Sequence, residues 1–129
     1  MAMVELDQMK FTLQGYEGML REVTDSLDLE GKTKRIEELE MEMEAPGFWD
    51  DPDSSNKKMK ELKNLKDTKE LCEKLAGQYS DIETLIEMGY EEEDPEMTAE
   101  IRGELEEFSE ELEGLRIKTL LSGEYDKDN

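Results

Sequence analysis

Carboxylates are the most abundant reactive side chains in this sequence, with 37 Asp and Glu residues against 16 Lys and Arg. The stretch DDPDSSNKKMKEL, which begins at Asp51, superficially resembles a calcium-binding loop. Such a loop needs glycine at its sixth position and glutamate at its twelfth. Counted from Asp51, these positions hold Asn56 and Leu62. The sequence therefore predicts no calcium site here, and the EEED run before Pro95 would attract cations only loosely.

Catalytic groups are equally hard to assemble from these residues. The chain has no histidine, which removes the commonest general base, metal ligand and neutral-pH switch. Its single cysteine, Cys72, cannot form an internal disulfide and falls at a core-facing position of a helical repeat. No histidine is available to activate it. We expect Cys72 to be a small buried hydrophobic residue, and we expect no catalytic residue, no cofactor and no metal.

An aromatic pair, Phe48 and Trp49, stands out in a chain that is only 6% aromatic. The pair lies in a loop, because Pro46 and Gly47 end one helix and the Asp51-Pro52 step starts the next. One interpretation is a buried plug that closes the end of a thin bundle, in which case Trp49→Ala would cost about 3 to 5 kcal/mol. The other is a patch that anchors a protein partner, formed by Phe48, Trp49, Asp50 and Asp51.

Charge is unevenly distributed along the chain. Residues 91–113 contain 12 acids and one base, Arg102, which leaves a local charge of −11. This run is either a solvated helix face or a site for a basic partner. Between Lys57 and Lys74, seven lysines accompany four acids, and this segment could lie against the acidic run EELEMEME at 37–44. A small phosphate-binding patch is the alternative there, although no glycine-rich loop or interleaved aromatic accompanies it.

Apolar residues recur at steps of three and four, which predicts amphipathic helices packed against one another. The first stripe runs from Leu6 to Leu27 and should be ended by Gly31. The helix that carries the third stripe should be roughly 35 residues long and should end at Gly89. The predicted stripes cover 6–27, 36–43, 59–86 and 101–119, the last followed by a helix end at Gly123.

The last two helices should form an antiparallel hairpin, because the link between them is short. Asp51-Pro52 and Asp94-Pro95 each place a capping carboxylate before a proline at the first helical position. No strand pattern competes with these helices. The predicted fold class is all-α, an antiparallel helical bundle with a long coiled-coil-like helical hairpin.

Composition limits the size, location and partners of the protein. The 129 residues are 35% hydrophobic, which allows one modest domain with a thin core. The formal net charge of −21 would repel a phosphate backbone, so we expect no direct nucleic acid contact. No apolar run approaches the roughly 20 residues that span a bilayer, and no signal region is present. We expect a cytoplasmic monomer without membrane contact.

Three segments resemble a known family when taken in order: SLDLEGKTKRIEELE, APGFWDDPDSSNK and TLLSGEYDKDN. They are similar to the N-terminal domain of the bacterial class I peptide chain release factors. The runs FWDDP at 48–52 and SGEYD at 122–126 are typical of the members that read UGA and UAA, and they differ from the sister group that reads UAG. The resemblance spans nearly the whole chain.

The resemblance implies a translation termination factor whose later domains carry a codon-reading tripeptide and a Gly-Gly-Gln loop that triggers peptidyl-tRNA hydrolysis. Neither GGQ nor a Ser-Pro-Phe tripeptide occurs in residues 1–129, so we expect this chain to be no enzyme by itself. The resemblance implies that residues 1–121 dock on the ribosome, against proteins at the base of the large-subunit stalk. Residues 122–129 would then begin a linker to the part that performs the chemistry.

Two other classes of protein remain open from the residues alone. A free-standing acidic coiled-coil adaptor or holdase chaperone would show the same helices and the same charge, and would oligomerise or bind unfolded clients. An enzyme built from carboxylates alone would have to hydrolyse peptidyl-tRNA as an isolated chain. Light scattering and a hydrolysis assay discriminate these classes from a docking domain.

Overall fold

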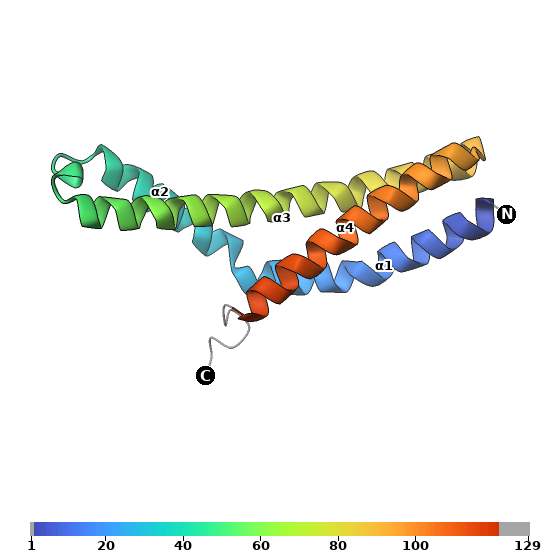
Figure 1. Cartoon of the computed structure of the whole chain (residues 1–129), viewed down its shortest axis with the longest axis horizontal. Helices are drawn as coiled ribbons and strands as arrows, with labels where there is room; N and C mark the ends of the chain where they lie inside the picture. Colours follow the sequence, from blue (N-terminus) through green and yellow to red (C-terminus); the bar gives the residue numbers. More distant parts are fainter. Residues whose placement is uncertain (1, 122–129) are drawn as a thin grey trace.

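The computed structural model describes residues 2–121, which fold into four α-helices and one short 3-10 turn with no strand among them (Figure 1). The predicted helix end at Gly123 and the predicted linker 122–129 lie outside the described residues. The all-α class is confirmed. The elements are α1 (Ala2–Leu27), α2 (Leu29–Glu44), η1 (Phe48–Asp50), α3 (Pro52–Glu92) and α4 (Pro95–Leu121).

The helices form two lobes that share α3 (Figure 1). In the first, called the bundle, α1 and α4 pack on the C-terminal half of α3. In the second, called the arm (residues 29–71), α2 packs along the N-terminal half of α3 and η1 closes the far end. The arm has a small core of its own, made by Ile36, Leu39 and Leu62. The molecule is therefore elongated, and α3, with 41 residues, is its spine.

An aromatic cluster lies at the centre of the bundle. Phe108 of α4 is fully buried, and its ring meets Tyr79 of α3 and Tyr16 of α1 edge to face, with centroids 6.0 and 6.1 Å apart. Such edge-to-face contacts add to the gain from burial. Each of the three helices supplies one ring, so the cluster fixes how they pack. Cys72 is buried in the same core, as predicted, and burial raises the pKa of its thiol.

The first helix ends at Leu27, four residues before the predicted break at Gly31. Asp28 adopts a left-handed conformation, with φ of 50°, and its carboxylate accepts a hydrogen bond from the Gly31 N–H at 3.2 Å. A side chain on Gly31 would collide with that carboxylate. The prediction that Gly31 breaks the helix is therefore wrong, because Gly31 lies in the first turn of α2 and leaves room for the cap.

Gly89 does not end the third helix either. It is buried inside α3, and a methyl group placed on it would lie 3.1 Å from Leu6 Cδ2 and 3.3 Å from Ile101 Cδ1. The helix continues to Glu92 and ends at Glu93, which adopts a left-handed conformation and donates its N–H to the Gly89 carbonyl at 2.9 Å. Gly89 is thus a point of close approach between α1, α3 and α4.

The predicted hairpin of α3 and α4 is confirmed, as are both predicted helix starts. Only two residues, Glu93 and Asp94, connect the helices. Asp94 accepts a hydrogen bond from the Glu96 N–H at 2.9 Å, and Asp51 accepts one from the Ser54 N–H at 3.4 Å. Across residues 2–121, no helix combines the length and the apolar character that a membrane crossing needs.

Candidate docking interface

The aromatic loop joins α2 to α3 at the far end of the arm (Figure 1). The chain turns at Gly47, whose φ of 87° is in the left-handed region that glycine adopts at no steric cost. Phe48 N–H then donates to the Ala45 carbonyl at 3.3 Å, and Asp50 N–H donates to the Gly47 carbonyl at 3.1 Å. These bonds give the loop a defined shape, so the side chains of η1 are presented in fixed directions.

Phe48 and Trp49 contact each other edge to face, with ring centroids 4.7 Å apart and planes at 80°. Phe48 is partly buried, whereas Trp49 is 54% exposed. Neither ring belongs to the hydrophobic cores found in residues 2–121. The interpretation of Trp49 as a buried plug is therefore wrong, because α2 and α3 are the only helices within residues 2–121 that contact η1. The docking interpretation stays a prediction.

The two aspartates beside the rings have different surroundings. Asp51 caps α3 through its side chain, and its carbonyl accepts the Ser55 N–H at 2.9 Å, so it has a structural role. Asp50 is exposed at the end of η1. Of the four predicted docking residues, Trp49 and Asp50 are thus the most accessible to a partner without disturbing the fold.

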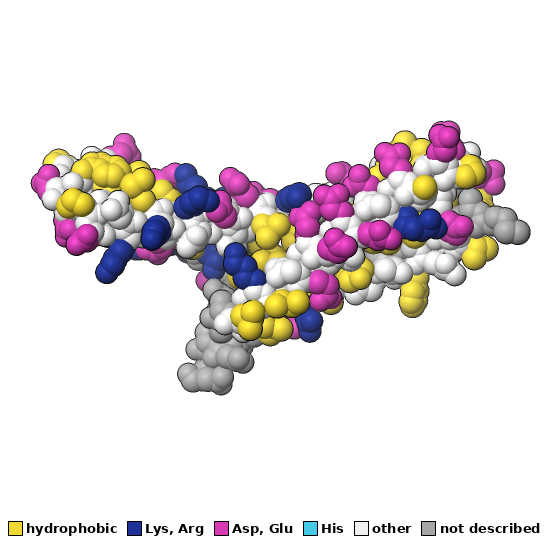
Figure 2. All heavy atoms as spheres, viewed as in Figure 1, with side chains coloured by type: hydrophobic (Ala, Val, Ile, Leu, Met, Phe, Trp, Pro, Cys, Tyr) yellow, Lys and Arg dark blue, Asp and Glu magenta, His cyan; other side chains and the backbone are white. Residues whose placement is uncertain are grey.

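Apolar side chains gather around this end of the molecule (Figure 2). A groove of about 330 Å³ between α2 and α3 is lined by Met43, Met59 and Leu62, with Lys63 and Lys66 among the residues at its edges. Met41 of α2 is also exposed. Sequence reasoning missed this groove, although the paired methionines of the two arm helices are a usable signal, because Met packs adaptably at binding surfaces.

Ion pairs between α2 and α3 hold the arm together. Arg35 donates to Glu61 through two nitrogens, at 2.8 and 3.0 Å, and Lys66 pairs with Glu40 at 2.9 Å. Lys58 contacts Glu42. The prediction that the lysine segment can lie against the acidic run at 37–44 is confirmed. The Arg35 guanidinium also holds the pKa of the Glu61 carboxyl below its usual range, chiefly through its hydrogen bonds.

The acidic run at 91–113 covers the end of α3 and the outer face of α4, and most of its carboxylates are exposed. Glu111 pairs with Lys74 at 2.9 Å, and Arg102 pairs with Glu5 of α1 at 2.5 Å. These contacts connect neighbouring helices, Glu113 pairs with Arg116 within α4 at 3.9 Å, and most of the remaining acids are exposed. The solvated-face interpretation accounts for this arrangement, and a basic partner stays a prediction.

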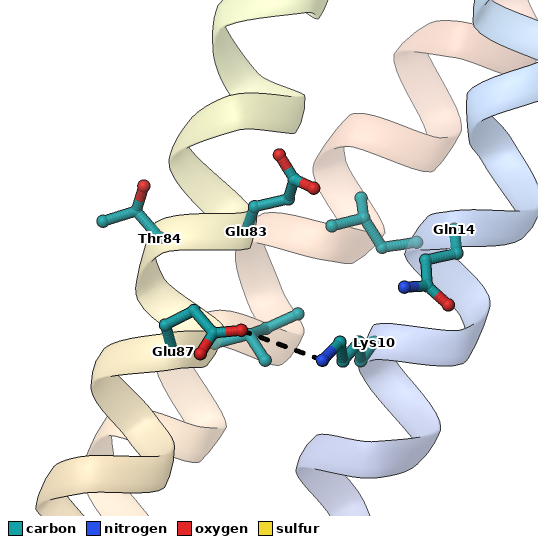
Figure 3. Close-up of a pocket in the computed structure, with 7 residues that line it drawn as sticks. Lys10, Gln14, Glu83, Thr84 and Glu87 are labelled. Carbon is teal, nitrogen blue, oxygen red and sulfur yellow. Dashed lines mark ion pairs between the residues drawn. The ribbon is translucent and has the colours of Figure 1, made fainter.

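A shallow pocket of about 260 Å³ lies between α1 and α3 (Figure 3). Lys10 and Glu87 face each other across it at 3.8 Å, and Gln14, Glu83 and Thr84 complete its polar rim. Leu13 and Ile86 form the apolar part of the lining. All five rim side chains are exposed. We interpret the pocket as an open seam between two helices, and no cluster of metal-ligating side chains occurs within the part of the chain that the structure describes.

Comparison with known proteins decides the family. Residues 32–129, three quarters of the chain, match the PCRF domain. The chain belongs to the PCRF domain family. The match begins in the first turn of α2 and includes the whole loop that carries Phe48 and Trp49. The residues proposed for docking are thus inside the PCRF domain, whereas α1 precedes the matched segment.

Several relatives of this PCRF domain protein are named peptide chain release factor 2, which confirms the resemblance to the release factors. The Clostridium perfringens (strain SM101) protein is 37% identical over 98% of this chain and 34% of its own length. The Streptomyces avermitilis protein is 34% identical over 98% of this chain and 33% of its own length. That of Lactiplantibacillus plantarum is 32% identical over the same shares. The chain spans about one third of the length of these relatives.

Proposed function

We propose that this PCRF domain docks a translation termination factor for UGA and UAA on the ribosome. The similarity to proteins named peptide chain release factor 2 supports a role in translation termination. The observation that carries the docking role is the exposed Trp49 at the end of a braced arm. Tryptophan at the centre of an interface commonly contributes a large share of the binding energy. The partner is a protein near the base of the large-subunit stalk.

The mechanism is placement of the factor. The arm holds η1 at a distance from the bundle, so its tip can reach a partner surface while the bundle stays outside the contact. Binding energy gained at the tip raises the residence time and the correct orientation of the rest of the factor. The chain itself performs no chemistry in this proposal. Hydrolysis of peptidyl-tRNA is carried out elsewhere in the longer factor, in the cytoplasm.

Binding to ribosomes tests this proposal. The chain would be incubated with purified bacterial ribosomes and its retention measured by co-sedimentation. Trp49→Ala should weaken binding by at least about tenfold, as loss of an interface hot spot does. The matched control is Phe11→Ala, which removes another exposed ring, 79% accessible, from α1 of the bundle. Equal binding by wild type and both variants would overturn the role of the tip.

The adaptor or holdase alternative keeps one supporting observation, the exposed Phe11 and Val4 on α1. An adaptor of this kind would associate through such residues into a stable oligomer, or would retain unfolded clients. Light scattering on the isolated chain separates the two functions. A monomer that binds ribosomes supports the docking role, whereas a stable oligomer without ribosome binding supports the adaptor.

A further inference from the structure

The negative charge of the protein is concentrated in the bundle. Residues 2–28 and 72–121 contain 22 acids and 6 bases, whereas the arm, residues 29–71, contains 12 acids and 9 bases. Lys and Arg side chains gather over the arm in Figure 2, and acids dominate the bundle. The repulsion expected from the net charge of −21 therefore acts mainly at one lobe. A polyanion that approached the arm would meet a nearly balanced surface.

Two pockets that share three lining residues form a groove along α3, from the arm to its junction with the bundle. Its outer section, about 430 Å³, is lined by Lys32, Lys57 and Lys60 together with Asn64 and Thr68. Its inner section, about 450 Å³, shares Lys32, Asn64 and Thr68 and adds Lys118 of α4. We call the two sections together the lysine groove. It extends along α3 from Lys57 to Leu71, roughly 20 Å at the rise of a helix.

The lysine groove is lined by more lysines than acids. Two acids line it, and both are paired: Glu61 with Arg35 at 2.8 Å, and Asp67 with Lys63 at 2.7 Å. By contrast, the groove lysines Lys57, Lys60 and Lys118 form no ion pair with any residue in 2–121. These lysines stay unpaired although the chain has more than twice as many acids as bases, so they are available to an external anion.

We propose that the lysine groove binds the phosphate backbone of an RNA strand. Three features suit a phosphate backbone. The cations are lysines, which bind phosphate as point charges, and Lys57, Lys60 and Lys118 have no competing ion pair within residues 2–121. Asn64 and Thr68 lie between the lysines and can donate to phosphate oxygens. Leu27, Leu71 and Leu115 line the inner section, where a ribose or base can pack.

This contact revises the expectation of no nucleic acid binding, and it is separate from the contact proposed for Trp49. The expectation was based on the charge of the whole molecule. The structure separates that charge into an acidic bundle and a nearly balanced arm. The field at the groove is therefore set by local lysines, because charges farther away than a Debye length of about 8 Å are largely screened at physiological salt.

Fluorescence anisotropy with a labelled oligouridylate tests the proposal on the full chain at several salt concentrations. Binding should weaken with salt, with a slope of log K against log salt of about −0.7 per phosphate contact. Lys57→Ala combined with Lys60→Ala should weaken binding by roughly tenfold and make the slope shallower by about 1.4. The matched control, Lys34→Ala with Lys69→Ala, removes the same charge from the arm outside the groove without breaking an ion pair between α2 and α3, and it should bind nearly as wild type does.

Three results would overturn the proposal. The first is absence of binding by the wild-type chain at low salt. The second is an equal loss of affinity in the two double variants, which would indicate a response to overall charge. The third is tighter binding of a polyglutamate peptide than of the oligouridylate, with the same dependence on Lys57 and Lys60, which would assign the groove to an acidic protein. Circular dichroism checks that each variant is folded, and none of the four substituted lysines is buried in the structure.

Discussion

The Arg35 guanidinium and the Glu61 carboxylate form a two-point ion pair, Nε to Oε2 at 2.8 Å and Nη2 to Oε1 at 3.0 Å. The pair joins α2 to α3 across 26 positions of sequence. Because only Ile36, Leu39 and Leu62 form the buried core of the arm, directional polar contacts must help set how its helices align. The pair therefore helps to align α2 with α3 in the arm whose end carries Trp49.

The pair makes the stability of the arm depend on pH. The pKa of Glu61 is lowered in the folded state from its ordinary value of 4.5. Its contribution is therefore fully present above that value and is lost as the pH falls through the folded pKa. Glu61→Gln should lower stability at neutral pH, and the difference from wild type should shrink below about pH 4. Urea unfolding of wild type and Glu61→Gln at a series of pH values measures this difference in stability. A difference that grows on acidification would contradict the stabilising role of the ionised Glu61 carboxylate.

Trp49→Ala should change the free energy of unfolding by no more than about 0.5 kcal/mol, because a half-exposed side chain outside the cores contributes little to folding. Phe108→Ala is the comparison, and it should cost about 3 to 5 kcal/mol since Phe108 is fully buried. Chemical denaturation of Trp49→Ala and Phe108→Ala measures both free energies of unfolding. A large loss of stability in Trp49→Ala would show that the ring is part of the core after all.

Gly89 should tolerate no branched side chain. Gly89→Val would press on Leu6 and Ile101 and should cost about 1 to 3 kcal/mol or more through overpacking. Gly77 provides the control, because it lies on the exposed face of the same helix with open space around it. Gly77→Val should stay within about 0.5 kcal/mol of wild type. Thermal unfolding of the two variants compares them, and equal stabilities would refute the close approach.

Glu93 holds a left-handed conformation that favours glycine, with φ of 53°. Glu93→Gly should therefore stabilise the α3–α4 hairpin by about 1 kcal/mol. The adjacent Glu92→Gly should do the opposite and cost about 1 kcal/mol, because Glu92 is the last helical residue of α3. Opposite signs at neighbouring positions in equilibrium unfolding confirm the cap, and the same sign at both would exclude it.

Hydrophobic spacing was enough to predict the helices and most of the core. Most residues at steps of three and four, from Leu6 in α1 to Leu115 in α4, are buried in the structure, whereas Met59, which begins the third stripe, is 41% exposed. The two glycines were assigned wrongly for one physical reason. Glycine was interpreted as a helix breaker at Gly31 and Gly89, but both are helical and are needed for close contact, with the Asp28 cap and with α1 and α4 respectively. Such contacts depend on partners that are distant in sequence or on cap geometry.

The exposure of Trp49 could not be decided from the sequence, because it depends on whether another helix reaches the end of α3. The structure shows that α4 packs on the C-terminal half of α3 and that only α2 accompanies the other half. The lysine groove was only hinted at by the run from Lys57 to Lys74. Its completion requires Lys32 of α2 and Lys118 of α4, which the fold brings together.

Stop-codon-dependent peptide release tests the central claim most directly. In a full-length release factor that contains this domain, the rate of release at UGA would be measured against factor concentration with and without residues 3–121. Deletion should slow release at low factor concentration and leave the rate at saturating concentration nearly unchanged, because the domain supplies binding and not chemistry. Trp49→Ala in the intact factor should shift the curve in the same direction. Equal release rates across the whole concentration range would contradict the docking function.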